Sequence, residues 1–198
     1  MRSLVAAACL CAALLAASAV GQPSAPTVKA AVVALTEDRA LRESFQQDLV
    51  ALARTRGYDA VTSYGLVDVQ EVDAKRFLEQ LKSSGVQAVL MVRPAAVGEG
   101  SSLESVRAEV SPRLFADMQR FARRVSRSGP DDLIAIVHLA IYMITSDRPE
   151  PISSGAVWLD EPVTDRAQGI QRLQQLIADN IDGVRPAIRR HLGLPPLP

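Results

Sequence analysis

The chain of 198 residues carries 22 basic and 22 acidic residues, so its formal net charge at pH 7 is +0. This balance argues against a protein that binds nucleic acid or an acidic membrane surface through its overall charge. Its two cysteines, Cys9 and Cys11, lie close to the N-terminus. The chain after Cys11 has no cysteine and can therefore form no disulfide. It must be stabilised by an ordinary hydrophobic core, for which its length is sufficient.

The first residues have the pattern of a secretory signal peptide. Arg2 supplies a positive charge, the run from Leu4 to Ala17 is apolar, and Ala17-Ser18-Ala19 has the small residues that precede cleavage sites. The run is too short for a membrane anchor, which needs about 20 apolar residues. We expect residues 1–19 to be removed and the product to be periplasmic or secreted, with no transmembrane segment after cleavage. The alternative is a retained hydrophobic helix.

The cysteines lie inside the apolar run, too early for a lipid-modified cysteine after a small-residue box. Both should leave with the signal peptide. Residues 20–27 contain two prolines and predict a disordered lead-in.

An apolar run from Val28 to Leu35 predicts a buried strand. Thr36-Glu37-Asp38 can then cap a helix over Arg39–Arg56, because Thr and Asp oxygens accept free backbone N–H groups. The apolar side of this helix consists of Leu41, Phe45, Leu49, Leu52 and Ala53. Gly57 suits the left-handed end of a helix, and Tyr58–Ser63 predicts a second strand, which completes a βαβ unit.

A second helix is predicted over Ala74–Ser84, capped by Asp73, and Val86–Val92 predicts a third strand. Parallel crossovers are nearly always right-handed. If the second and third strands flank the first on opposite sides, the two helices cover opposite faces of the sheet. The continuous apolar pattern of Val28–Leu35 fits a central strand that is buried on both faces.

Residues 99–132 look like an insertion, with a helix over Pro112–Arg127 whose proline lies at the first helical position. Leu133–Ile144 predicts a fourth strand and Gly155–Leu159 a fifth. The two should be antiparallel, since the connection between them, with a turn over Asp147–Pro151, is short.

A closing helix is predicted to start at Asp165 and to be interrupted at Gly183. A further helical segment, Val184–Leu192, should be broken or kinked near Pro186. Residues 193–198 form a proline-rich tail. Together these elements predict a single α/β domain over residues 28–192. Its mixed five-stranded sheet should have the strand order 2-1-3-4-5, with helices on both faces.

No motif for a nucleophile, a phosphate-binding loop or a zinc site occurs in the sequence, so we predict neither a cofactor nor a metal. His138 lies among apolar residues and is either a core histidine or a ligand or base. Trp158, on the short last strand, is either a packing residue or a ligand platform. The loop acids Asp131-Asp132 and Asp160-Glu161 are either solvated or face each other across a cleft.

Arginines gather on one side of the predicted helix over residues 112–127. At about 100° per residue they fall within roughly one sixth of the helix circumference. They are Arg113, Arg120, Arg124 and Arg127. Because a guanidinium group can donate two hydrogen bonds to a carboxylate or phosphate, this arginine stripe predicts a binding surface for an envelope protein or an anionic envelope glycan or lipid. The alternative is a solvated helix face.

The segment Leu41–Gly57 followed by Tyr58-Asp59-Ala60-Val61, with a later strand containing Trp158 and a closing amphipathic helix, resembles small exported bacterial envelope proteins and lipoproteins of unknown function. Their α/β domain is similar to the N-terminal domain of the Tol–Pal translocation protein and to the curli secretion lipoprotein. The resemblance implies an envelope location and brings no catalytic residues. This chain differs in having no lipid-attachment cysteine and in the insertion at residues 99–132.

The predicted function is that of a non-enzymatic periplasmic envelope protein that binds a partner or assists assembly. The alternative is a periplasmic hydrolase or small-ligand-binding protein that uses the loop acids and His138. A pocket that contains His138 and a carboxylate within hydrogen-bonding distance would favour this alternative.

Overall fold

The computed structural model describes residues 27–96, 114–123, 134–144, 148–159, 163 and 165–196. The predicted signal peptide, and the lead-in up to residue 26, lie outside this range. The elements in chain order are β1 Lys29–Ala34, α1 Arg39–Thr55, β2 Asp59–Thr62, the 3₁₀ turn η1 Ser63–Gly65, α2 Ala74–Ser83, β3 Ala88–Ala96, α4 Met118–Ala122, β4 Ile134–Ile144, β5 Pro149–Trp158 and α5 Arg166–His191.

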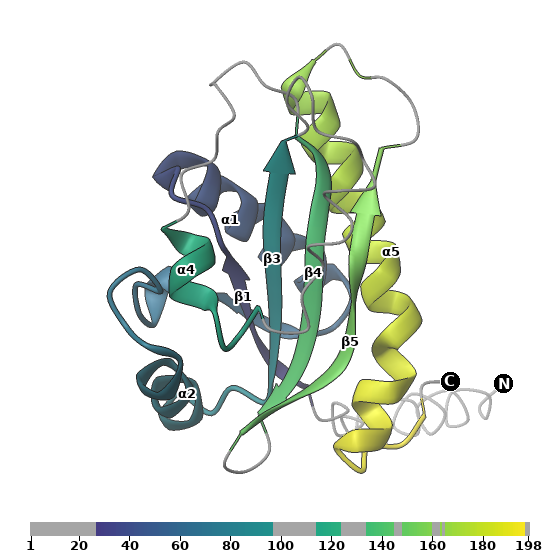
Figure 1. Ribbon diagram of the computed structural model, residues 1–198. Helices are drawn as coiled ribbons and strands as arrows, with labels where there is room; N and C mark the ends of the chain where they lie inside the picture. Colours follow the sequence, from purple (N-terminus) through teal and green to yellow (C-terminus); the bar gives the residue numbers. More distant parts are fainter. Residues whose placement is uncertain are drawn as a thin grey trace, which may run out of the picture.

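The strands form one five-stranded sheet with the order β2-β1-β3-β4-β5 (Figure 1), which confirms the predicted topology. β1 pairs in parallel with β2 on one side and with β3 on the other. β4 is antiparallel to both β3 and β5. The central position of β1 explains its continuous apolar sequence, because its side chains are buried on both faces of the sheet.

Helices cover both faces of the sheet, as predicted. One core is formed where the apolar sides of α1 and α5 pack on the sheet, and includes Phe45 and Leu173. The other lies beneath α2 and α4, and includes Phe77 and Met118. Figure 1 shows α5 running along β4 and β5.

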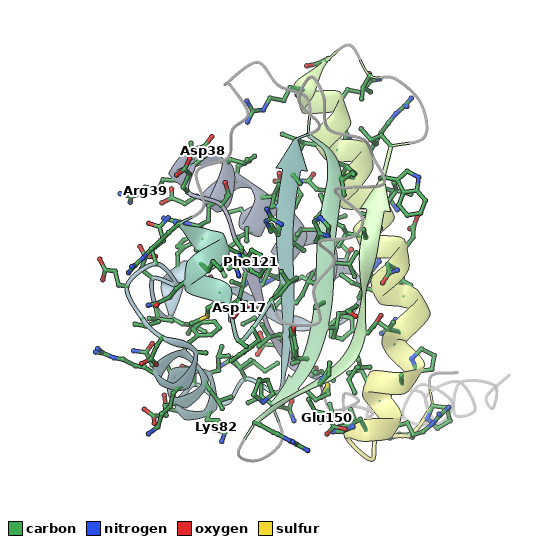
Figure 2. The ribbon with its side chains drawn as sticks, viewed as in Figure 1. Asp38, Arg39, Lys82, Asp117, Phe121 and Glu150 are labelled. Atoms are coloured by element: carbon green, nitrogen blue, oxygen red, sulfur yellow. The ribbon has the colours of Figure 1, made fainter. Side chains whose placement is uncertain are left out.

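Aspartate side chains start three of the helices, as the sequence indicated. The carboxylate of Asp38 accepts a hydrogen bond from Leu41 N at 3.0 Å (Figure 2), and that of Asp73 accepts one from Arg76 N at 2.8 Å. Asp165 accepts one from Ala167 N at 3.0 Å. Each bond satisfies a backbone donor that the first turn of a helix leaves free.

The last strand begins earlier than predicted. β5 starts at Pro149, where a turn was expected, and the register shifts between Ile141 and Tyr142 of β4, opposite Pro151. Proline is tolerated in a strand at a sheet edge, where its missing N–H removes no bond of the ladder. Since β5 is the edge strand, its two prolines do not prevent pairing, and the predicted turn over Asp147–Pro151 is wrong at its C-terminal end.

The helix predicted over Pro112–Arg127 is also shorter in the described residues. Residues 114–117 form turns, and α4 covers only Met118–Ala122. Leu114 and Phe115 are adjacent and both buried, and the ring centroid of Phe115 lies 5.5 Å from that of Tyr142. Adjacent residues point about 100° apart on a helix. A turn instead lets both side chains enter the core. The expected burial of Leu114, Met118 and Phe121 is confirmed.

The closing helix is continuous, contrary to the prediction of an interruption at Gly183. α5 runs for 26 residues from Arg166 to His191 and contains Pro186. Its buried side includes Leu173, Ile177, Ile181 and Ile188, so the same side faces the core before and after the proline. Packing of this apolar side therefore outweighs the local preference for a break.

Candidate functional site

His138 is fully buried in the middle of β4, with an exposed fraction of 0%. It lies opposite Arg93 of β3, on the sheet face that α4 covers. The guanidinium of Arg93 in turn lies 5.0 Å from the ring centroid of Phe121 (Figure 2). This is the environment of a core histidine.

The alternative that joins His138 to loop acids stays a prediction. Asp131, Asp132, Asp160 and Glu161 lie outside the described residues. His138 lines neither the cleft beside the last turns of α5 nor the cleft between α1 and β2. Trp158 ends β5 opposite Ile136 and is partly exposed.

The described part of the chain has neither a metal-binding cluster nor a membrane-spanning helix. It contains no group of three or more His, Cys, Asp or Glu side chains placed to hold a metal ion. None of its helices is both long and apolar enough to cross a membrane.

Of the predicted arginine stripe, the structure describes only Arg120. This side chain is exposed on α4, whereas Arg113, Arg124 and Arg127 lie outside the described residues. Residues 114–117, which separate Arg120 from Arg113, form turns. The stripe as a partner surface remains a prediction.

A basic cleft that the sequence did not reveal lies where the end of α1 meets the last turns of α5. Its volume is about 1030 Å³, and four arginines line it: Arg56, Arg185, Arg189 and Arg190. Asp182 is the acid in this lining, and Leu194 and Pro196 of the C-terminal tail add an apolar wall. We call these residues the arginine cleft.

Arg56 joins the two helices through carboxylates of α5. Its Nε lies 2.8 Å from Asp182 Oδ2, and its Nη2 lies 3.8 Å from Asp179 Oδ1. These ion pairs neutralise Arg56. Within the part of the chain that the structure describes, no carboxylate lies within ion-pair distance of Arg185, Arg189 or Arg190.

Arg185, which lines the cleft, also covers the ring of Tyr58. Its guanidinium carbon lies 5.6 Å from the ring centroid of Tyr58. Gly57 has a φ of 80°, which favours glycine, and a Cβ there would lie 3.4 Å from Arg185 Nη2. The small glycine thus leaves room for the guanidinium beside the backbone.

Arg189 and Arg190 occupy different positions in the cleft. Arg189 is only 8% exposed, and its Nε donates a hydrogen bond to the carbonyl of Pro195 at 2.7 Å. Arg190 is exposed. The tail is also held by the bond from Leu194 N to the carbonyl of Arg189 at 2.9 Å. Arg189 therefore ties the tail to α5, while Arg190 remains accessible.

No family model matches this chain, and no curated protein matches its sequence. Solved structures with a similar fold include TolB from Acinetobacter baumannii, at 14% identity and a TM-score of 0.40, covering 79% of this chain and 28% of that one. Lipoprotein GNA1162 from Neisseria meningitidis has 11% identity and a TM-score of 0.42, covering 81% and 97%. A PelC dodecamer from Paraburkholderia phytofirmans has 11% identity and a TM-score of 0.40, covering 80% and 91%.

TolB and a lipoprotein are thus among the solved structures of similar fold, as the resemblance implied, whereas no family model matches. At these identities and TM-scores, no activity or partner is carried over from them.

Proposed function

We propose that this chain is exported by a cleaved signal peptide and acts in the periplasm, or outside the cell, as a non-enzymatic envelope protein. In this role it binds a partner or assists assembly. The N-terminal pattern of Arg2, an apolar run and Ala17-Ser18-Ala19 supports export.

Partner binding is supported mainly by the polarity of residues 114–123, which contain α4 and which we call the α4 segment. Its apolar residues Leu114, Met118 and Phe121 are buried against the sheet, while Arg120 is exposed. Further arginines follow closely in sequence, at Arg124 and Arg127. A docked segment that offers the guanidinium of Arg120 to solvent suits a partner with carboxylate or phosphate groups. We propose an acidic envelope protein or an anionic envelope glycan or lipid.

Export predicts a defined mature N-terminus. Mass spectrometry of the protein purified from its native cells should give a chain that begins at Val20, because cleavage follows Ala19. An intact Met1, or a lipid-modified N-terminus, would contradict the proposal.

Replacing Arg120 and Arg124 with Gln should weaken capture of the partner from crosslinked cell envelopes and reduce the dependence of that capture on salt. The expected thermal stability is nearly unchanged, since Arg120 is exposed and substitutions at exposed sites usually change stability by less than about 0.5 kcal/mol. The measurement compares tagged mature proteins at low and at added salt.

The matched control is Arg76→Gln, which removes an exposed arginine from α2. It should leave capture intact. If capture is insensitive both to the double substitution and to salt, the arginines of the α4 segment serve only as a solubilising surface.

A further inference from the structure

The arginine cleft holds more positive charge than the structure neutralises. Arg56 is paired with Asp182 and Asp179. Arg185, Arg189 and Arg190 come from consecutive turns of one helix and line the same cleft, with no carboxylate of the described chain within ion-pair distance. Like charges four residues apart on a helix repel each other. An anion between them would relieve this repulsion.

The hydroxyl of Tyr58 provides a second, independent observation. Tyr58 is 8% exposed, and its hydroxyl oxygen is buried and has no hydrogen-bond partner in the described part of the chain. Buried polar groups without partners are rare in native proteins. The aromatic ring that carries this hydroxyl lies beneath Arg185, which lines the cleft.

Charged residues that line the cleft also influence the protonation of Tyr58. Burial raises the pKa of Tyr58, the positive charge of Arg185 opposes this rise, and Asp182 and Arg189 exert smaller effects. The phenol therefore stays protonated at neutral pH and is available as a hydrogen-bond donor.

Part of the cleft wall is apolar. Pro186, Leu194 and Pro196 lie beside the arginines. A volume of about 1030 Å³ is larger than inorganic phosphate needs, and falls at the upper end of the range of about 300–1,000 Å³ for small-molecule sites. The shape therefore suits an organic molecule that carries more than one anionic group.

We infer that the arginine cleft binds a small organic ligand with several oxyanion groups, such as a phosphate ester or a polycarboxylate. Arg185 and Arg190 donate hydrogen bonds to its oxygens. Arg189 adds charge while it holds the tail, and Tyr58 donates from below once Arg185 turns toward the ligand. The carbon part of the ligand lies against Leu194 and Pro196. The site is separate from the α4 segment, which covers the other face of the sheet.

Calorimetric titration of the full mature chain, residues 20–198, tests this site. The probes are inorganic phosphate, glycerol 3-phosphate and citrate at constant ionic strength. We expect saturable binding to one site, tighter for an organic anion than for phosphate. In the variant Arg185→Gln/Arg190→Gln the affinity should fall by at least about tenfold, because two charge-assisted donors are lost.

Three further variants separate a specific site from a general effect of charge. Arg76→Gln removes one positive charge from the far face and should change affinity by less than about twofold. Tyr58→Phe removes only the hydroxyl, so the protein should stay folded and bind several-fold more weakly. Arg185→Lys keeps the charge but loses the planar guanidinium group. Its affinity should lie between those of the wild type and the double variant. Arg189 is left unchanged, because its substitution would also release the tail.

Thermal unfolding of each variant checks that the fold is retained. The inference is overturned if none of the three anions binds saturably, or if Arg76→Gln weakens binding as much as the double variant does. It is also overturned if only vesicles containing phosphatidylglycerol bind, since the cleft would then contact a lipid surface and not a soluble ligand. These outcomes are independent of the proposed binding of an envelope partner to the α4 segment, which is tested separately.

Discussion

Replacing Phe45 with Ala should lower the free energy of unfolding by about 3 kcal/mol. The side chain is 0% exposed and lies in the core that α1 and α5 form against the sheet. Its removal takes a large apolar surface out of the core and leaves a cavity that the neighbouring strands cannot fill completely. Urea denaturation followed by circular dichroism measures the difference.

Ser44→Ala is the matched control, since Ser44 is the preceding residue of α1 and is exposed. Alanine is the better helix former, so this variant should be neutral or slightly more stable. A loss of less than about 1 kcal/mol for Phe45→Ala would mean that α1 does not bury this side of the helix.

Much of the sheet could be predicted because several independent signals agreed. Asp38 and Asp73 marked the helix starts, and Gly57 takes the positive φ angle expected at a helix end. The right-handed crossover then placed β2 and β3 on opposite sides of β1.

The missed features depend on tertiary context, which local patterns do not contain. The strand at Pro149 forms because β5 is an edge strand, and edge position is a property of the finished sheet. The turn before α4 forms because the core accepts both Leu114 and Phe115.

The arginine cleft was missed for two reasons. Arg56 and Arg185 are far apart in sequence and meet only when α1 and α5 pack side by side on the sheet. In addition, the interruption predicted at Gly183 hid the helical spacing of Arg185 and Arg189. That spacing of four residues was the available signal, and it becomes informative only if the helix continues.

Replacing Pro186 with Ala tests this continuity and should raise the free energy of unfolding by about 1–3 kcal/mol. A proline inside a helix costs about 3 kcal/mol, because it lacks the N–H that would bond to the carbonyl of Asp182 and its ring crowds that carbonyl. Proline also restricts the unfolded chain, which offsets part of the cost. Pro186 is exposed, so the substitution removes little packing. The gain is measured as a higher denaturant concentration at the midpoint of unfolding, with an unchanged dependence of the unfolding free energy on denaturant concentration.

The neighbouring Ala187 supplies the converse test. It is exposed within α5, so Ala187→Gly should lower the free energy of unfolding by about 1 kcal/mol if the helix continues through this position. Ile188, the next residue, is buried and holds the last part of α5 against the core although Pro186 donates no backbone hydrogen bond. If Pro186→Ala gives no gain and Ala187→Gly no loss, the helix ends near Gly183. Arg185 and Arg189 would then lose the common helical side that brings them to the cleft.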